Sequence, residues 1–462
     1  MPGPWATSPG SSCWACSWPV ASSLRSEDSP GIGVARRVCE SECVETLDID
    51  HLGTVIDSRR TDLRVVTSGN CSTPLTVLGK VDTLLAEYRL HLLNAPRGIP
   101  QRDGVIPESA FVGVGMRHHP RLVYFPMRLS GVPFLYQRRL RVDVVIAHTS
   151  APIAGKVSLG LEINVLPGAI AACKAAGGIV IAQVNRQMPY TFGDGELPLD
   201  VFDAIVEVDE PVLNLATSEA DGTASGGGMS RADSARIIGD LVSRRVADGA
   251  TLQLGIGEIP DAALDGLRGK RGLGIWSEVI GDGVLELDQA GALDPARTIT
   301  ASALMGSAAL YAWAHRNERL RVLRTETTNS PSIIATQPLM TSINTALQVD
   351  LYDQANAASV NAKVYSGFGG QSDFTVGALH APRGQALMAL RSWHPKADVS
   401  TIVPLIEAPV TSFQHTAVIT EQGVAEIAWR DQKSQAVQLI EHAAHPAARD
   451  DLWEEAQELG LL

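Results

Sequence analysis

The chain has 462 residues, and its 45% hydrophobic content can supply the cores of two globular domains. Its 51 acidic residues outnumber its 38 lysines and arginines, and the formal net charge of −13 argues against a nucleic-acid partner. Polar residues interrupt the apolar stretches well before the ~20 positions that a membrane helix requires, so we expect no membrane partner and a cytoplasmic protein.

The first 45 residues differ in composition from the rest of the chain. They are rich in Ser, Pro and Gly, and they hold four of the six cysteines, at positions 13, 16, 39 and 43. Cys13 and Cys16 form a Cys-x-x-Cys pair, but the segment lacks the periodicity of a folded zinc module and does not have the pattern of a signal or transit peptide. We therefore expect a disordered extension over residues 1–45 and no metal site.

Regular patterning begins at about residue 46, where short β-branched runs alternate with longer helical stretches. The run at residues 178–185 is almost entirely apolar, as expected of a strand buried on both faces of a parallel sheet. We predict a first α/β domain over 46–216. Its elements include strands at 63–66, 142–146 and 178–185 and helices at 74–93 and 168–177.

Residues 217–234 are small and polar and include three consecutive glycines, which is typical of a connector between domains. We predict a second α/β domain over 235–462. It opens with a helix over 235–248, a strand over 250–254, the turn Gly255-Ile-Gly257, and a helix from about Asp261. A strand, a glycine turn and a helix N-terminus together can bind an anion, although Gly-x-Gly is also found in simple strand-to-helix turns.

A second glycine loop lies near residue 370. Gly367, Gly369 and Gly370 fall within four positions and are followed by Gln371 and Asp373. Such a density of glycines indicates that the backbone comes close to a ligand.

Glu278 is the candidate nucleophile. Four apolar residues close to it in the sequence, at positions 273, 275, 279 and 280, would keep its carboxylate in a partly dry site, where it attacks an acyl carbon more readily. The alternatives are a solvated acid beside a turn or an acid at a helix N-terminus. No histidine has the spacing of a metal ligand or of a serine triad, so the chemistry we expect is acyl transfer through a carboxylate.

These motifs together resemble the acetyl-CoA hydrolase/CoA-transferase family, in particular its class I type members that act on 4-hydroxybutyrate, acetate and succinate. The resemblance runs from about residue 64 to 455. It is carried by ordered motifs such as Leu254-Gly-Ile-Gly257, Ser277-Glu278, Gly281-Asp-Gly283, Met340-Thr-Ser-Ile-Asn344, Gly367 to Phe374 and Thr420-Glu-Gln-Gly-Val-Ala425. It implies two open α/β domains with mainly parallel sheets, of the NagB/RpiA/CoA-transferase type, with the active site at the domain interface.

The resemblance also implies roles for individual residues. Glu278 takes the position of the family's covalent glutamate, and a basic residue near the pantetheine or phosphates would be Arg391 or Lys396. The remaining expected contacts with coenzyme A are Gln253, Leu254, Gly255, Ile256, Gly257, Asn344, Gly367 and Gly370. Coenzyme A is then a substrate, no cofactor is permanently bound, and we expect a homodimer.

The function implied is transfer of CoA between a short-chain acyl-CoA and a free carboxylate through a glutamyl-CoA thioester. The acyl group would be of the acetyl, propionyl, butyryl, 4-hydroxybutyryl or succinyl type, and Trp276, which stands where the family often has a His-like or Tyr-like residue, leaves this choice open. One alternative is a short-chain acyl-CoA hydrolase that uses the same site. A second alternative is a non-catalytic CoA-binding sensor.

Overall fold

The computed structural model describes residues 46–57, 59–214, 230–410 and 414–462, which belong to one unit spanning Cys43–Leu462. The predicted extension, with its Cys-x-x-Cys pair, lies outside the described residues, as do positions 217–229 of the predicted connector. The division into domains at 217–234 stays a prediction.

The first sheet has seven strands, all parallel, in the order β4-β3-β2-β1-β5-β7-β9. Runs of β-branched residues form its central strands, as the sequence predicts for β1, β5 and β7. The strands are β1 (Arg64–Thr67), β2 (Tyr88–His91), β3 (Val105–Ser109), β4 (Val123–Tyr124), β5 (Val144–Ser150), β7 (Ile179–Asn185) and β9 (Ala204–Val208).

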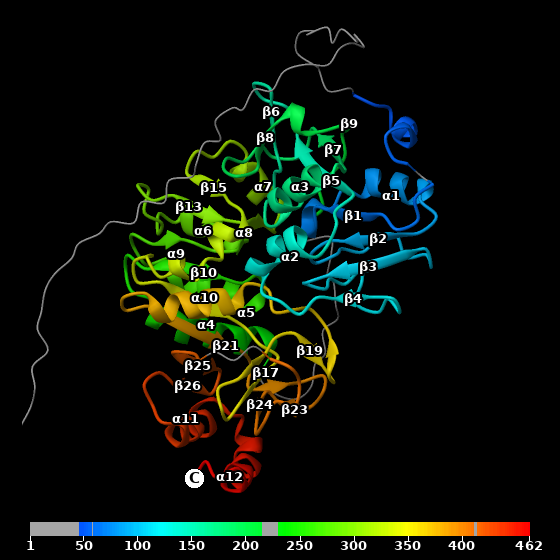
Figure 1. Ribbon diagram of the computed structural model, residues 1–462. Helices are drawn as coiled ribbons and strands as arrows, with labels where there is room; N and C mark the ends of the chain where they lie inside the picture. The colour runs from blue at the N-terminus through cyan, green and yellow to red at the C-terminus, as the bar shows by residue number, and fades with distance from the viewer. Residues whose placement is uncertain (1–45, 58, 215–229, 411–413) are drawn as a thin grey trace, which may run out of the picture. The chain divides into compact units, whose positions relative to one another are not determined.

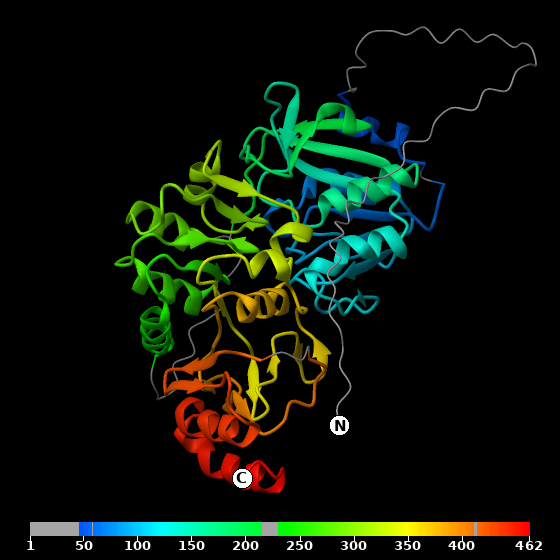
Figure 2. The ribbon, with the colours of Figure 1, turned by 60° about the vertical axis from the view of Figure 1, so that its left-hand side comes forward.

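Helices cover both faces of this sheet (Figures 1 and 2), which explains why its strands are apolar on both sides. Side chains alternate along β5: Val144 and Ile146 belong to the cluster that contains α1 (Leu75–Leu84). Val145 and Ala147 belong instead to the cluster that contains α2 (Val132–Arg138) and α3 (Leu166–Ala175).

The helix predicted over 74–93 is wrong in its second half. Helix α1 ends at Leu84, and β2 begins at Tyr88 and pairs with both β1 and β3. Tyr88 and Leu90 are fully buried on one face of the sheet. A short apolar run fits a helix and a strand equally well, and here pairing with distant strands decides between them.

The second sheet has six strands in the order β11-β10-β16-β21-β25-β26, and only β26 is antiparallel to its neighbour. Leu387 and Ala389 of β21 pack in the cluster formed with α4 (Arg231–Arg245) and α5 (Glu258–Leu267). Ala386 belongs to the cluster of α10 (Gln371–His380), and Met388 to that of α11 (Gln432–Gln438). The strands are β10 (Thr251–Leu254), β11 (Gly274–Ile275), β16 (Thr341–Asn344), β21 (Gln385–Ala389), β25 (Ala417–Thr420) and β26 (Gly423–Glu426).

The helices around this sheet follow the predicted order, but α4 spans Arg231–Arg245 rather than 235–248, so it begins inside the predicted connector, and α5 begins at Glu258 rather than at Asp261. Pro260 is tolerated because it lies in the first turn, where a backbone N–H has no partner within the helix. Figure 1 shows α4 beside α5. The helices are α4 (Arg231–Arg245), α5 (Glu258–Leu267), α9 (Pro331–Ile334), α10 (Gln371–His380), α11 (Gln432–Gln438) and α12 (Arg449–Glu458).

Short elements complete the fold. No helix in the described ranges is long and apolar enough to cross a membrane. The remaining helices are α6 (Asp282–Gln289), α7 (Ala308–Ala314) and α8 (Thr325–Thr328). Five short pairs of strands are β6 (Lys156–Ser158) with β8 (Glu196–Pro198), β12 (Val279–Ile280) with β14 (Ala303–Leu304), β13 (Ile299–Ala301) with β15 (Leu320–Val322), β19 (Ser359–Val360) with β20 (Lys363–Val364), and β22 (Trp393–His394) with β23 (Val399–Ser400). A small three-stranded sheet has β17 (Gln348–Asp350) between β18 (Ala355–Asn356) and β24 (Ile402–Val403).

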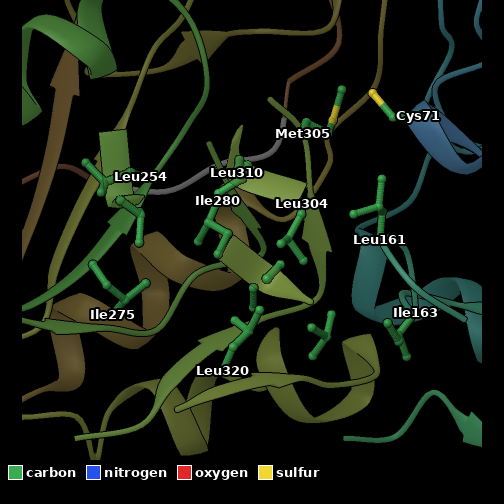
Figure 3. Close-up of a cluster of buried hydrophobic side chains, with 14 of the residues drawn as sticks. Cys71, Leu161, Ile163, Leu254, Ile275, Ile280, Leu304, Met305, Leu310 and Leu320 are labelled. Atoms are coloured by element: carbon green, nitrogen blue, oxygen red, sulfur yellow. The ribbon is translucent and has the colours of Figure 1, made fainter. Parts of the chain in front are cut away.

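The largest hydrophobic cluster draws residues from both sides of the predicted connector. Figure 3 shows part of it, with Leu161 and Ile163 from the first part of the chain together with Leu304 and Leu320 from the second. The thiols of Cys71 and Cys173 are free and buried, as expected of reduced core cysteines. Both parts of the chain therefore contribute to one continuous core next to the candidate site.

Candidate active site

The strand order of the two sheets indicates that two loops, after β1 and after β10, lie where a ligand would bind. Strand β1 lies between β2 and β5, and β10 lies between β11 and β16, so the chain changes its direction of winding at β1 and at β10. Ligands of open parallel sheets bind beyond the carboxyl ends of the strands at such points. Asn70, after β1, and Gly255, after β10, line one cavity of about 290 Å³, and Glu278 lines it as well.

Glu278 is held firmly at the edge of this cavity. It lies between β11 and β12, and its backbone carbonyl accepts hydrogen bonds from the amides of Ser302 (2.8 Å) and Ala303 (2.9 Å). Ile275 and Ile280 on either side are buried, as the sequence predicts, whereas the Glu278 side chain is partly accessible. The fold thus buries the residues beside Glu278 and turns its carboxylate toward the cavity.

Asn329 donates a hydrogen bond to the carboxylate, from Nδ2 to Glu278 Oε2 over 2.6 Å. Its amide is oriented by Thr328, whose Oγ1 donates to Asn329 Oδ1 (2.8 Å). Trp276 Nε1 in turn donates to the Thr328 carbonyl (2.9 Å), so Trp276 supports the end of α8 and is not part of the cavity lining. Sequence reasoning missed Asn329, because no motif marks an asparagine 51 positions from the acid it contacts.

Gly370 approaches the carboxylate from the other side. A Cβ atom added at Gly370 would lie 1.8 Å from Glu278 Oε2 and 2.1 Å from Asn329 Nδ2, so any larger residue would displace both groups. Gly370 is also the N-cap residue of α10, and no side chain caps that helix. The N-terminal end of α10, which carries the positive end of the helix dipole, therefore lies next to Glu278.

Burial is the main reason that the pKa of Glu278 is raised, from 4.5 to about 7. The negative charges of Asp373 and Glu162 raise it further, and the hydrogen bond from Asn329 opposes the shift. Burial also raises the pKa of Glu162 to about 7 and that of Asp373 to about 6. All three acids are thus poorly solvated, and the charges of Glu162 and Asp373 make ionisation of Glu278 less favourable.

Glu162 is tied to the cavity wall by a chain of hydrogen bonds. Its carboxylate accepts from the Gly69 amide (3.2 Å) and from Asn70 Nδ2 (2.5 Å), and Asn70 Oδ1 accepts from Asn94 Nδ2 (2.8 Å). Asn70 and Asn94 line the cavity that contains Glu278. Sequence reasoning missed these three residues, since each follows or precedes a different strand and the sequence does not show that they meet.

The predicted CoA-contacting residues fall into three groups. Those that line the cavity together with Glu278 are Gln253, Leu254, Gly255, Ile256, Asn344, Gly367 and Gly370. Gly257 lines an adjoining cavity. Arg391 and Lys396 line neither: Arg391 Nη2 donates to Glu258 Oε2 (3.3 Å), and Lys396 is exposed between β22 and β23.

Gln253 and Asn344 form a polar pair on neighbouring strands β10 and β16. Gln253 Nε2 donates to Asn344 Oδ1 and Asn344 Nδ2 donates to Gln253 Oε1, each over 3.2 Å. Ser342 Oγ also donates to Gln253 Oε1 (2.5 Å). This network fixes both amides where they line the cavity.

The glycine loop at 366–370 is joined to the first part of the chain through its backbone. The Val112 amide donates to the Ser366 carbonyl (2.8 Å), and the Leu129 amide donates to the Gly369 carbonyl (2.9 Å). A Cβ at Gly367 would lie 2.5 Å from the Ala110 carbonyl oxygen. The loop therefore closes one side of the cavity against residues that follow β3.

The described ranges contain no group of three His, Cys, Asp or Glu side chains that could hold a metal ion. The groups gathered at the cavity are a poorly solvated carboxylate, side-chain amides and the N-terminus of a helix. They suit attack of a carboxylate on an acyl carbon, with hydrogen-bond donors nearby for the negative charge that develops.

Comparisons with known proteins point to the same chemistry. A family model described as "Acetyl-CoA hydrolase/transferase C-terminal domain" matches residues 306–456. The chain is 36% identical over 347 residues to 4-hydroxybutyrate coenzyme A transferase of Clostridium kluyveri, covering 72% of this chain and 77% of the relative. It is 31% identical to succinyl-CoA:acetate/propanoyl-CoA:succinate CoA transferase of Fasciola hepatica, covering 74% and 72%.

A solved structure extends the comparison to the fold. The crystal structure of 4-hydroxybutyrate CoA-transferase from Porphyromonas gingivalis superimposes with a TM-score of 0.72 at 26% identity, over 90% of this chain and 97% of that one.

Proposed function

Because the chain belongs to the acetyl-CoA hydrolase/transferase family, we propose that it transfers CoA between a short-chain acyl-CoA and a free carboxylate, with Glu278 as the covalent nucleophile. The observation that carries this proposal is the Glu278 carboxylate between Asn329 and Gly370, in a cavity that both glycine loops line. The protein is thus an enzyme with CoA-transferase or acyl-CoA hydrolase activity.

The reaction is a double displacement, in which CoA is first transferred to Glu278 and then to the acceptor. The Glu278 carboxylate attacks the thioester carbon, and the CoA thiolate leaves behind a mixed anhydride. The thiolate then attacks the glutamyl carbonyl, which releases the free carboxylate and leaves CoA on Glu278 as a thioester. An acceptor carboxylate repeats the two steps in reverse, so that a new acyl-CoA departs and Glu278 is again ionised.

Asn329 and the N-terminus of α10 are suited to stabilise the tetrahedral intermediates. Both already lie against Oε2 of Glu278, and the oxyanions form on carbonyl carbons next to that oxygen. Donors that are fixed before the reaction cost no reorganisation during it, and one such donor typically contributes about 3 kcal/mol. Thr328 and Trp276 keep the Asn329 amide in this orientation.

The proposal is tested by trapping the intermediate. After incubation with acetyl-CoA, mass spectrometry should find CoA attached to the peptide that contains Glu278, and borohydride should reduce the thioester and inactivate the enzyme. Glu278→Gln should show no adduct, whereas the matched variant Glu286→Gln, on α6 and outside the cavity, should label like the unmodified protein. Adduct formation at another residue, or full turnover by Glu278→Ala, would exclude the mechanism.

A hydrolase is the second candidate, because the same glutamyl intermediate can be attacked by water and the Glu278 side chain is partly accessible. A panel of acyl-CoA donors and carboxylate acceptors separates the two by product. A transferase forms a new acyl-CoA that contains the acceptor, and a hydrolase releases free CoA at a rate that the acceptor does not change. A non-catalytic CoA-binding protein would form neither product and no adduct.

A further inference from the structure

A second cavity of about 430 Å³ adjoins the cavity that contains Glu278. Asn70, Asn94, Ile256 and Met305 line both, so these four residues form their common boundary. The mechanism described above uses none of the residues that line only the second cavity. Its size is within the range of small-molecule sites, and it adjoins the space where the acyl group and the thiol react.

The second cavity is positively charged although the protein is acidic. Arg97 and Arg117 are the charged residues among the described residues that line it, and these include no aspartate or glutamate. The whole chain, by contrast, has a formal net charge of −13. Two cations that no acid in the described part of the lining faces produce a local positive potential, which attracts an anion despite the net charge of the molecule.

The two arginines differ in how they are held. Arg117 Nε donates to the Tyr365 carbonyl (2.8 Å), and its guanidinium lies 3.6 Å from the centre of the Tyr365 ring. This fixes the plane of the group and leaves its two Nη atoms as donors. The Arg97 side chain is exposed and forms no ion pair with any residue in the described ranges.

The cations near α5 are already neutralised in part. Arg231 and Arg391 both donate to Glu258 Oε2, at 3.2 and 3.3 Å. Gly257, the N-cap residue of α5, lines the second cavity without a side chain to cap the helix. The positive end of α5 thus adds to the potential from Arg97 and Arg117.

We propose that Arg97 and Arg117 form an anion-binding subsite for the remote negative group of a substrate whose acyl carbon reacts at Glu278. The subsite rests on the proposed function and deepens it. Two substrate groups have the required chemistry: a phosphate of coenzyme A, and the second carboxylate of a dicarboxylic acyl group or acceptor. In both cases the guanidinium groups donate charge-assisted hydrogen bonds to oxygen atoms.

The test compares Arg97→Gln, Arg117→Gln and the charge-preserving Arg97→Lys with the unmodified enzyme. Donors are acetyl-CoA and acetyl-pantetheine, which lacks all phosphates, and acceptors are propionate and glutarate. We expect Arg97→Gln and Arg117→Gln to lower kcat/KM by about tenfold or more for substrates that carry the remote anion, with much smaller losses in Arg97→Lys. The matched control is Arg236→Gln, an exposed arginine on α4 that lines neither cavity.

The pattern of losses identifies the anion. A loss with acetyl-CoA that disappears with acetyl-pantetheine assigns the subsite to a phosphate, and a loss with glutarate that is absent with propionate assigns it to the second carboxylate. An equal loss with acetyl-pantetheine and propionate, neither of which carries a remote anion, would overturn the proposal, as would unchanged kinetics with all four substrates. Thermal unfolding of each variant shows whether it is folded.

Calorimetric binding separates this inference from the proposed function. Titration with CoA, pantetheine, glutarate and propionate measures the subsite without any reaction. If the unmodified protein transferred no CoA but the two Gln variants still bound CoA or glutarate more weakly, the proposed function would fail and the subsite would stand. If the unmodified protein transferred CoA but both Gln variants kept unaltered binding and kinetics, the proposed function would stand and the subsite would fail.

Discussion

At the scale of single residues, the chemistry depends on one carboxylate that the protein makes unusually hard to ionise. Burial, Asp373 and Glu162 all raise the pKa of Glu278, which reaches about 7. A less solvated carboxylate is a stronger nucleophile, but only the ionised fraction reacts, so the environment that favours attack also limits the pH range of activity.

We therefore expect kcat/KM to rise with pH and to level off above about pH 7, because the neutral acid cannot attack the thioester. The rising part of the profile, the acid limb, is measured from the pH dependence of kcat/KM with a non-titrating acceptor analogue, or from that of the rate at which CoA becomes attached to the protein. A limb near pH 4.5, the ordinary pKa of a glutamate, would contradict the buried setting of Glu278.

Glu162→Gln should move this acid limb to lower pH, because it removes a negative charge that disfavours ionisation of Glu278. The variant keeps an oxygen that can accept from Asn70 or Gly69. A role in packing alone would lower the rate without moving the limb, and Glu286→Gln, an exposed carboxylate on α6, serves as the control that leaves the limb in place.

Gly370→Ala should strongly lower activity while the protein stays folded, since the added methyl group would displace the Glu278 carboxylate from its position. We expect a loss of at least about a hundredfold in kcat/KM, the scale of removing one donor to an oxyanion. Initial rates and circular dichroism check the two parts of this prediction. Activity close to that of the unmodified enzyme would show that the carboxylate does not need this contact.

At the scale of elements, close packing between α4 and α5 depends on a glycine. A Cβ at Gly239 would lie 2.5 Å from the Ala262 carbonyl oxygen, whereas one at Gly79 in α1 would meet nothing within 4 Å. Gly239→Ala should therefore lower the free energy of unfolding by about 1–3 kcal/mol through overpacking. Gly79→Ala should raise it by about 0.5–1 kcal/mol, because alanine favours the helix. Urea unfolding of both variants measures the contrast, and equal effects would contradict it.

Sequence patterns predicted some of the helices and strands and missed others. Periodicity and glycine turns predicted β1, β5, β7, α3, α4 and β10, because each has a local signal of its own. The prediction of a helix over 74–93 was wrong in its second half, because β2 is defined by pairing with β1 and β3, which lie elsewhere in the sequence. Asn329, Asn94 and Glu162 were missed for a similar reason: only the folded chain brings them to Glu278 or to one another.

At the scale of the whole molecule, the acids around the site make stability depend on pH. Glu162, Glu278 and Asp373 have folded-state pKa values of about 7, 7 and 6, above their ordinary values of 4.5, 4.5 and 3.8. At these three sites the folded protein therefore binds more protons than the unfolded chain between about pH 4 and 7, and their contribution to stability falls as pH rises through that window. His148, whose pKa burial lowers to about 4, acts in the opposite direction over part of the same window. The pKa of Glu108 is lowered to about 2, so this residue changes the stability of the protein only at lower pH.

Urea unfolding should accordingly give a smaller free energy at about pH 8 than at about pH 5.5, by up to about 2 kcal/mol for Glu162 alone. Glu162→Gln should flatten this dependence and raise stability at the higher pH. A free energy of unfolding that grew across the same interval would mean that these carboxylates are solvated in the folded protein.

The backbone ties at the glycine loop have a consequence for how substrates enter. The amides of Val112 and Leu129 bond to carbonyls 254 and 240 positions away in the chain, at Ser366 and Gly369. Any wide opening of the molecule at this place must break both bonds and expose both amides to water. Hydrogen–deuterium exchange at these two positions therefore reports on the route: slow exchange during turnover would mean that substrates pass through existing channels, and fast exchange would reveal a hinge.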